Sequence, residues 1–222
     1  MLARRLEICR LGGKIKYIPY NTAYTSSATW TVPYTQWYEI HIVGTGGAGG
    51  DGGTGGLGPN YSTYRGGAGG GGGSGGHTAG RYLLAAGTEI PLTIGTSTTF
   101  GGVADAFYMS VSKGENGGNG GNANPDHFED GAGGSAGIKG RVIGSGNLSV
   151  SNTGNNGGVG SAGDETTTVN HQVVVKGGTG GKSPYGGYGA GGAGGNGSDS
   201  STRNAGEAGG SGAVVITAYQ QE

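Results

Sequence analysis

The stretch "GGAGGDGGTGGLG", residues 46–58, decides the fold, because a residue other than glycine stands at every third position: Ala48, Asp51, Thr54 and Leu57. A period of three matches the polyproline-II-type helix, which has three residues per turn and rises about 3.1 Å per residue. Such a helix carries its side chains along one stripe and leaves two bare glycine faces. Because it has no internal hydrogen bonds, its N–H and C=O groups are free to pair with neighbouring helices. The stretch therefore predicts a rod in a packed bundle and not a flexible linker.

Similar glycine-rich tracts recur along the chain, at about 44–58, 66–76, 114–121, 131–137, 154–163, 177–197 and 206–212. One such tract alone would be disordered, because ordering glycine costs more backbone entropy than ordering any other residue. Seven tracts whose ends are held together by strands could form a bundle whose backbone pairing offsets that cost. If so, replacing Gly49 or Gly52 by valine should be more damaging than replacing Thr54, whose side chain already points outward.

Short runs with alternating apolar residues separate the tracts and predict β-strands. These runs are 29–33, 37–43, 81–86, 89–95, 106–111, 171–175 and 213–219. Pro91 has no N–H to donate to a ladder, which places its strand at a sheet edge or a bulge. No helical periodicity follows residue 16, so the chain is expected to be all-β, with helix limited to a short N-terminal one.

The composition excludes several classes of protein. Of 222 residues, 59 are glycine, only 32% are hydrophobic and 12% are charged, and the formal net charge is −1. The chain therefore lacks both a conventional large core and a basic field for nucleic acid. Cys9 is the single cysteine, which rules out an internal disulfide framework and a cysteine-based zinc site. No apolar run approaches the ~18 residues of a membrane span, so membrane insertion is not expected.

The N-terminal segment, residues 1–28, differs from the rest. Five of the thirteen basic residues fall within its first sixteen positions. Two interpretations stay open: a short amphipathic helix that docks on a partner, and a solvated terminus without a role. A transit peptide is disfavoured by Glu7.

Ligand-binding motifs built on glycine do not fit. Gly44, Gly46 and Gly49 formally match a dinucleotide loop, but no helix is expected after them. The calcium-binding nonapeptide repeat is matched only in part and only once, at residues 46–51, and no tandem copies follow. A lone "YRGG" at 64–67 is no RNA-binding repeat, and six prolines are too few for collagen. We therefore expect no nucleotide, metal or other cofactor.

Catalytic constellations are also missing. The four histidines, His41, His77, His127 and His171, are far apart in the sequence and lack metal-ligand spacing. Carboxylates pair only in loop-like segments, 126–130 and 164–165, where solvated charge is the plainer interpretation. No nucleophile-elbow sequence occurs. The chain is accordingly predicted not to be an enzyme.

Side chains return at the interruptions between glycine tracts, which are 57–65, 122–130, 182–188 and 196–207. Their mixture of Tyr, Asn, Ser, His, Phe and Asp is similar to that of antibody paratopes, which combine rigid aromatic rings with adaptable polar groups. Composition alone leaves two alternatives: recognition loops or merely polar turns.

The order of segments resembles the glycine-rich domains of bacteriophage tail-fibre and related virion proteins. The opening "TWTVPYTQWYEIHIVGTGGAGGDGG", the middle "LTIGTSTTFGGVADAF" and the closing "GGAGGNG…AGGSGAVVITAY" resemble that family in the same order, over residues 29–219. The resemblance implies a jelly-roll-like antiparallel β-sandwich carrying an inserted bundle of polyglycine-II helices, within a domain at 29–222. The segment 1–28 matches nothing in the family and is the expected attachment point to other virion proteins.

The resemblance also implies a function. In the tail-fibre-tip adhesins of this family, the loops between glycine tracts contact the host receptor. Carried over by position, the candidates for receptor contact are Tyr61, Tyr64, His127, Phe128, Tyr185 and Tyr188. The expected partner is a host surface glycan or an outer-membrane protein, the expected state a homo-oligomer, and the expected location the exposed virion surface or tail fibre. The alternative is a purely structural virion or extracellular filament subunit whose loops contact its own copies.

Overall fold

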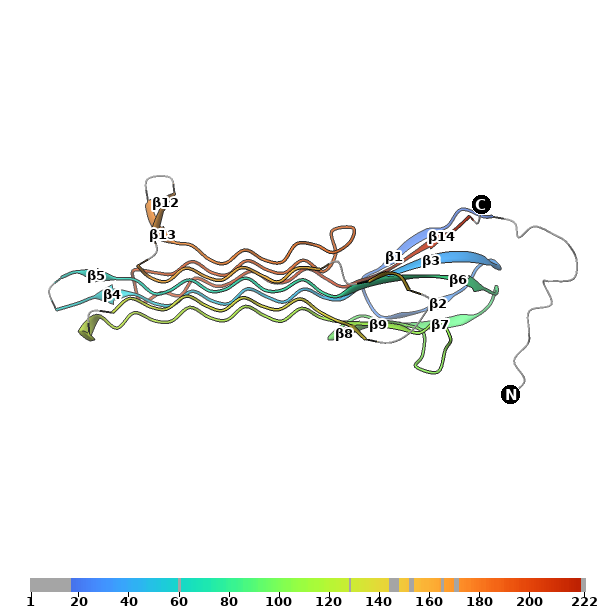
Figure 1. The fold of residues 1–222 in the computed structure, drawn as a ribbon, viewed down its shortest axis with the longest axis horizontal. Helices are drawn as coiled ribbons and strands as arrows, with labels where there is room; N and C mark the ends of the chain where they lie inside the picture. The colour runs from blue at the N-terminus through green and yellow to red at the C-terminus, as the bar shows by residue number, and fades with distance from the viewer. Residues whose placement is uncertain are drawn as a thin grey trace, which may run out of the picture.

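The computed structural model describes residues 17–59, 61–127, 129–143, 148–151, 154–164, 166–169 and 172–220. Figure 1 shows an elongated molecule with β-sheets at one end and a bundle of extended, undulating segments running away from them. The one helical element of the described residues is the 3-10 turn η2 (Pro125–His127). The expected all-β class with antiparallel sheets is thus confirmed.

Two five-stranded sheets, in which each strand pairs antiparallel with its neighbours, form the end from which the bundle extends. The first sheet has the order β1 (Asn21–Tyr24), β14 (Ala213–Ala218), β3 (Gln36–Val43), β6 (His77–Leu84) and β11 (Leu148–Ser151). The second has the order β10 (Val142–Ile143), β9 (Met109–Ser112), β8 (Ser97–Phe100), β7 (Glu89–Thr93) and β2 (Ala28–Thr31).

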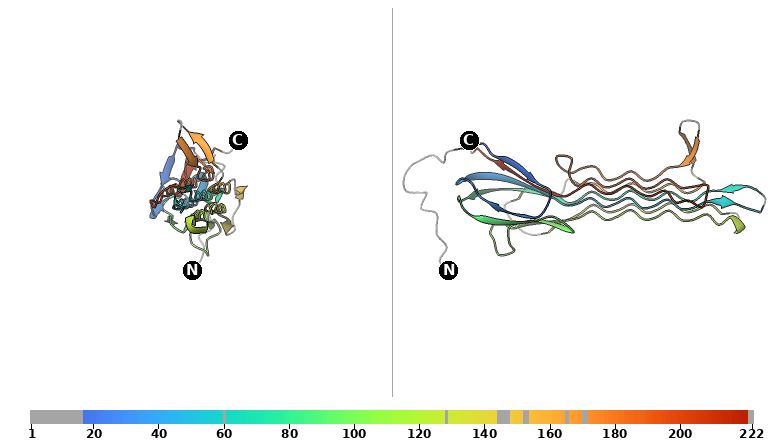
Figure 2. Two further views of the ribbon diagram at one scale, coloured as in Figure 1. Left: turned by 90° about the vertical axis from the view of Figure 1, so that its left-hand side faces the viewer. Right: turned by 180° about the vertical axis from the view of Figure 1, so that it is seen from behind.

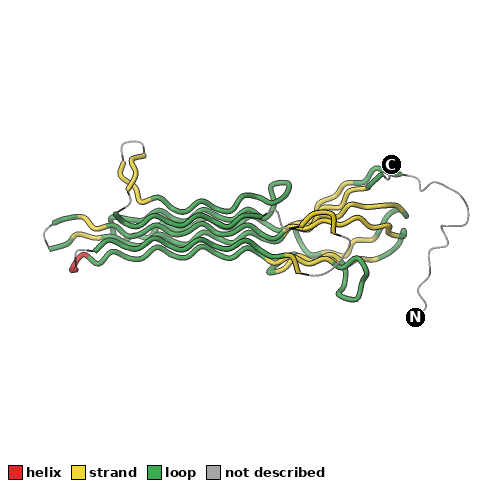
Figure 3. The backbone as a smooth tube through the Cα atoms, in the orientation of Figure 1, coloured by secondary structure: helices red, strands yellow, loops and turns green. Residues whose placement is uncertain are grey.

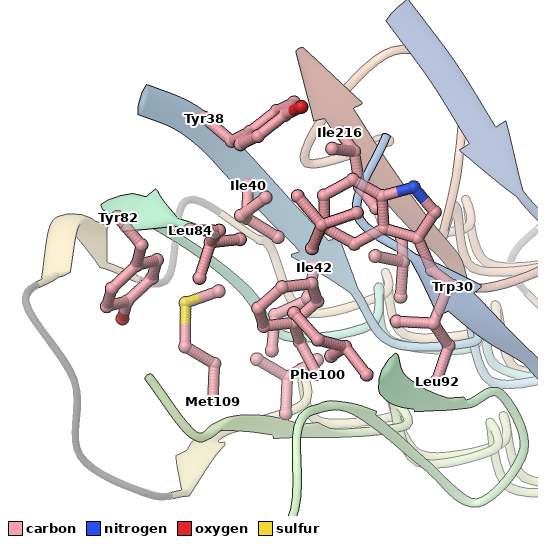
Figure 4. Close-up of a cluster of buried hydrophobic side chains, with 14 residues drawn as sticks. Trp30, Tyr38, Ile40, Ile42, Tyr82, Leu84, Leu92, Phe100, Met109 and Ile216 are labelled. Carbon is pink, nitrogen blue, oxygen red and sulfur yellow. The ribbon is translucent and has the colours of Figure 1, made fainter. Parts of the chain in front are cut away.

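The hydrophobic core lies between these two sheets. Tyr38, Ile40 and Ile42 alternate along β3 and are fully buried, as the period-two pattern predicts. Leu92 and Phe100 of the second sheet belong to the same apolar cluster (Figure 4). Each such side chain removed from water contributes roughly 1.5–3 kcal/mol. The sheets therefore form a β-sandwich with a conventional, though small, core.

The sandwich begins before the domain boundary expected at residue 28. β1 lies inside the predicted attachment segment and pairs with β14. Just before it, the Ile18 N–H donates to Oε1 of Gln36 at 2.8 Å, and Nε2 of Gln36 donates to the Ile18 carbonyl at 3.0 Å. The segment 17–28 is thus part of the fold. Residues 1–16, including the expected N-terminal helix, lie outside the described residues.

Pro91 does not mark a sheet edge. Its strand β7 lies between β2 and β8, and no register shift occurs where it pairs with them. The Pro91 carbonyl accepts from the Gly101 N–H at 3.0 Å, just beyond the end of β8, where Gly101 has a φ of 80°. In an antiparallel pair the N and O of one residue face the same neighbour. The missing N–H therefore faces the point where β8 ends, which makes proline tolerable in an internal strand.

The bundle consists of eight extended segments within the described residues: 44–55, 66–76, 114–123, 131–140, 154–163, 176–182, 189–198 and 203–212. They run side by side as extended, undulating segments without helix or strand assignment, between the sandwich and the far end (Figures 2 and 3). The tract expected at 177–197 proves to be two segments, because a turn at 183–188 reverses the chain. Over 44–55, a rise of about 3.1 Å per residue gives a bundle about 34 Å long.

Segment 66–76 is the centre of the bundle. Its successive N–H groups donate in rotation to three neighbours: Gly69 to Gly195, Gly70 to Gly118 and Gly71 to Gly158, at 2.8 to 2.9 Å. Its carbonyls accept from three others, the segments 44–55, 131–140 and 176–182. A period of three with bonds to six surrounding chains is the packing expected of polyglycine II. Segment 203–212 lies outside this ring and pairs with 44–55 and 189–198.

Packing explains why the segments are rich in glycine. A Cβ built on Gly49 would lie 1.9 Å from the Ala193 carbonyl oxygen, and one on Gly52 would lie 1.9 Å from that of Asn196. Gly71 occupies the triplet position that carries side chains in the outer segments, yet its Cβ would lie 1.9 Å from the Thr179 oxygen. The central segment therefore requires small residues on all three faces, and between Gly66 and Gly76 it has nothing larger than serine.

Asparagine side chains complete the backbone pairing at the surface. Oδ1 of Asn116, Asn119 and Asn122 accepts from the N–H groups of Ala48, Asp51 and Thr54 at 3.0, 2.9 and 3.1 Å. These N–H groups face outward, where no other segment of the described chain accepts from them. The triplet spacing of the asparagines matches the triplet spacing of their donors. Side-chain amides thus replace a missing neighbour along one side of the bundle.

Candidate functional site

The end of the bundle opposite the sandwich, here called the distal end, is where the extended segments reverse direction. It carries the hairpin of β4 (Gly56–Leu57) and β5 (Thr63–Tyr64), the turn η2, the hairpin of β12 (Thr166–Val169) and β13 (Gln172–Val175), and the turn 199–202. Figures 1 and 2 show these elements grouped together, away from the sheets. Three of the four interruptions that were considered as recognition loops lie at this end, namely 57–65, 122–130 and 196–207.

The β4–β5 hairpin presents two exposed apolar side chains. Tyr61 is 89% exposed and Leu57 is 67% exposed. Tyr61 is the one non-glycine residue of the described chain with a positive φ, 58°, and its N–H donates to the Gly58 carbonyl at 2.9 Å. A left-handed tyrosine is uncommon and such strain gathers at functional positions. Tyr64, by contrast, is half-buried in the hairpin stem.

The turn η2 forms a second projection at the distal end. Asn124 and Glu129 close it by exchanging backbone hydrogen bonds of 2.8 and 3.1 Å. The backbone of His127 belongs to this turn. Phe128, which was also predicted to contact a receptor, lies outside the described residues. The structure therefore places the Tyr61, Tyr64 and His127 positions at the same end of the bundle.

Tyr185 and Tyr188 lie elsewhere. They belong to the turn between segments 176–182 and 189–198, which lies next to the sandwich because the Tyr185 ring stacks on His41 of β3. The Tyr188 N–H donates to the Tyr185 carbonyl at 2.9 Å across Gly186 and Gly187, which have φ values of 56° and 87°. The five predicted contact residues that the structure describes are thus divided between the two ends of the bundle and do not form one surface.

Tyr185 packs on a pair of histidines that the sequence separates. Nδ1 of His41 and Nε2 of His77 are 3.1 Å apart, and the Tyr185 ring stacks on His41 with centroids 4.0 Å apart. Burial, and to a lesser extent the neighbouring His41, lowers the pKa of His77 to about 4. Burial also lowers the pKa of His41, against the opposing effect of Glu39. Two neutral imidazoles and one tyrosine therefore fasten the 183–188 turn to the outer face of the first sheet.

His41 and His77 are far apart in the sequence, but the fold brings their rings together. β3 and β6 pair antiparallel, with Val43 opposite His77 and His41 opposite Ala79. Each strand continues into a segment of the bundle, and these segments pair along their length. The sequence contained a signal for this pairing: the glycine tract 44–58 follows the strand of His41, and the tract 66–76 precedes the strand of His77. Among the described residues, no three His, Cys, Asp or Glu side chains group closely enough to hold a metal ion.

A polar groove of about 520 Å³ opens at the distal end, formed by three parts of the chain that are remote in sequence. Its lining residues are Arg65, Val174, Val175, Asn196, Gly197, Ser198, Asp199 and Asn204. Its walls are tied together by backbone bonds: the Gly197 N–H donates to the Val175 carbonyl at 2.9 Å, and the Gly66 N–H to the Ser198 carbonyl at 2.8 Å.

The groove was not predicted as a site, although most of its polar residues fall within the interruption 196–207. Arg65 is held in place by its own N–H, which donates to Oδ1 of Asp130 at 2.6 Å. Arg65 and Val174 come to the same place because the segments 66–76, 176–182 and 189–198 all pair with one another. The sequence signal for this contact is too weak to have found it.

Comparisons with known proteins add no assignment. No protein-family model matches the chain, and a search of the curated proteins finds no match. In the part of the chain that the structure describes, no helix has the length and apolar character to cross a membrane. The features of the chain that bear on its function are therefore the geometry of the bundle and its distal end.

Proposed function

We propose that this chain is a bacteriophage virion adhesin, which holds to the particle at its sandwich end and contacts a host-cell surface with its distal end. One observation carries the proposal. Both ends of the described chain lie at the sandwich, where the Ile18 N–H donates to Gln36 and the Tyr219 N–H donates to the Trp37 carbonyl. The β4–β5 and β12–β13 hairpins lie at the other end of the bundle (Figure 2), and the groove lined by Arg65 and Asp199 lies there too. The sequence resemblance to virion glycine-rich domains supports the same role.

The physical character of the bundle suits a spacer. Every N–H from Gly66 to Gly76 donates a hydrogen bond to a neighbouring segment. Backbone groups tied in this way in three directions leave little freedom for bending between the two ends. A rigid support lowers the entropy cost of binding, because the loops are already presented in position. Side-chain chemistry is concentrated where the glycine segments stop.

A purely structural role is the second candidate, and it has its own support. Val159 is 70% exposed and Ile138 is 46% exposed, both on the side of the bundle. Apolar side chains along the rod would suit lateral packing against further copies of the chain. In that case the sides of the bundle, and not its distal end, would carry the function.

Loop replacement distinguishes the two roles. Residues 58–62 are replaced by a Gly/Ser loop of equal length in particles that carry the chain. The adhesin role predicts a fall of at least about tenfold in adsorption to host cells, equivalent to about 1.4 kcal/mol of binding, with normal particle assembly. The matched control replaces residues 102–106, a turn on the sandwich in which Val103 is 83% exposed. Normal adsorption with the 58–62 replacement, or failed assembly, would contradict the adhesin role.

A further inference from the structure

The distal groove combines hydrogen-bond donors, acceptors and an apolar wall. Arg65 supplies a guanidinium, Asp199 a carboxylate, Asn196 and Asn204 amides, and Val174 a half-buried apolar surface. A volume of about 520 Å³ falls within the range of about 300–1,000 Å³ typical of small-molecule sites.

Several of these polar groups keep unused hydrogen-bonding capacity. Oδ1 of Asn196 accepts from the Gly177 N–H at 3.0 Å, which orients the side chain and leaves its Nδ2 as a donor. Nδ2 of Asn204 donates to the Asn196 carbonyl at 3.0 Å, which leaves its Oδ1 as an acceptor. Each amide is therefore held by one bond and offers its other end.

The two charged groups of the groove are also uncommitted. Among the described residues, the ion pairs are those of Glu39 with His41 and Arg81, so Arg65 and Asp199 form none. Their charges are opposite, and the groove has no net charge. This balance does not favour a polyanion such as nucleic acid or a phosphate chain, which would meet the Asp199 carboxylate. It favours a ligand that is neutral or carries both signs.

Vicinal hydroxyl groups fit this arrangement. Each sugar hydroxyl both donates and accepts, so adjacent hydroxyls can bond to a paired donor and acceptor. The groove offers donors at Arg65 and at Nδ2 of Asn196, and acceptors at Asp199 and at Oδ1 of Asn204. The C–H face of a pyranose ring is apolar and suits Val174. Because the walls are fixed by backbone bonds and each amide by one hydrogen bond, binding would order chiefly the side chains of Arg65 and Asp199.

We propose that the distal groove is a saccharide-binding site, which takes a neutral or zwitterionic glycan chain through its vicinal hydroxyls. The biological meaning of this site rests on the proposed adhesin function, because a host-surface polysaccharide is the source of glycan that the distal end would meet. The binding chemistry itself is independent of that function and is measured on the purified chain.

The test immobilises capsular polysaccharide and lipopolysaccharide, purified from cells that the particles adsorb to, and measures binding of the full chain by interferometry. We expect saturable binding that is lost after periodate treatment, which cleaves vicinal diols. Asp199→Asn and Arg65→Gln should each weaken binding about tenfold or more, since each removes a charged hydrogen-bonding group. Glu89→Gln, an exposed acid on the sandwich, is the matched control and should bind normally.

Each outcome has a distinct meaning. Unchanged unfolding midpoints in Asp199→Asn and Arg65→Gln establish that the variants are folded. Equal binding by these variants and the unaltered chain would overturn the groove assignment. Binding of the chain to outer-membrane protein from the same cells, with none to polysaccharide, would overturn the saccharide proposal while supporting adhesion. The purified chain could bind polysaccharide through the groove while particles that carry the groove variants still adsorb normally. This result would support the saccharide site and overturn the adhesin function.

Discussion

A single methyl group at the centre of the bundle should disrupt it. In Gly71→Ala the new Cβ would lie 1.9 Å from the Thr179 oxygen, whereas ordinary contact begins at 3.4 Å. Segment 176–182 would therefore have to retreat by roughly 1.5 Å, the difference between these two distances. Its bonds from Gly178 to Gly69 and from Gly181 to Gly72, and the bond it accepts from Gly158, are 2.6 to 2.9 Å long and would be stretched or lost.

The expected cost follows from those contacts. Three hydrogen bonds at about 1 kcal/mol each, together with about 1 kcal/mol or more of packing strain, amount to roughly 4 kcal/mol. This is a large part of the stability of a typical domain, which is about 5–15 kcal/mol. A local loss of 4 kcal/mol corresponds to about a thousandfold faster amide exchange in the affected segments.

Hydrogen exchange followed by mass spectrometry measures this loss directly. Peptides covering 66–76 and 176–182 should exchange about a thousandfold faster in Gly71→Ala, whereas the β-sandwich should change much less. Trp30 and Trp37 both lie in the sandwich, so their fluorescence reports separately on that part of the fold. Ala132→Val adds bulk at an exposed position of segment 131–140 and should leave exchange unchanged. Equal exchange in Gly71→Ala and the unaltered chain would refute the packing argument.

Three further predictions concern hydrogen bonding and titration. Because the folded state lowers the pKa of His77 to about 4, stability falls as the pH drops from about 6.5 toward 4, by up to about 1.4 kcal/mol per pH unit. The lowered pKa of His41 acts in the same direction. Urea midpoints should show this fall, and His77→Gln should reduce it. Asn119→Ala removes the acceptor of the Asp51 N–H and should lower the free energy of unfolding by only about 0.5–1 kcal/mol, because water can replace the lost acceptor. The Asp51 amide should exchange faster in this variant, and unchanged exchange would contradict the pairing. Tyr185→Ala should expose His41 and raise its pKa toward 6.5 in an NMR titration, and an unmoved pKa would contradict the stacking.

Much of the bundle could be predicted from the sequence, because its order depends on a local pattern. The triplet spacing at 46–58 identified the extended rods, and the clashes of a Cβ at Gly49 and Gly52 bear out the distinction between packed and outward positions. The absence of any residue larger than serine within 66–76 is a further signal that this segment is central. A segment surrounded by neighbours on all sides has room only for small side chains, so its central position could have been predicted from the sequence.

Strands with a long alternation of apolar and polar residues were predicted, and several short strands were missed. Residues 37–43 alternate clearly, and β3 forms there. β8 (Ser97–Phe100), with the sequence STTF, has a single large apolar residue, so its pattern is too short to detect. β1 carries exposed and half-buried residues at a sheet edge, which gives it no strong hydrophobic alternation. The strand expected at 171–175 is observed as β13 from Gln172 onward, and His171 itself lies outside the described residues.

The candidate site was only partly accessible to sequence reasoning, because it depends on contacts between remote segments. Composition identified the distal interruptions that contain Tyr61 and His127. It could not tell that the turn holding Tyr185 and Tyr188 lies at the opposite end, since that depends on how many times the chain reverses. The groove between Arg65 and Asp199 arises only when three segments pack together, and no local pattern encodes it.

The most direct test of the central claim is the orientation of this chain on the intact particle, determined by electron cryo-microscopy of particles alone and bound to host envelopes. The account predicts that the sandwich end docks on the particle, while the distal end with Tyr61 and Asp199 points outward and reaches the host surface. A distal end buried against other virion subunits, or a chain enclosed within a capsid shell, would contradict it.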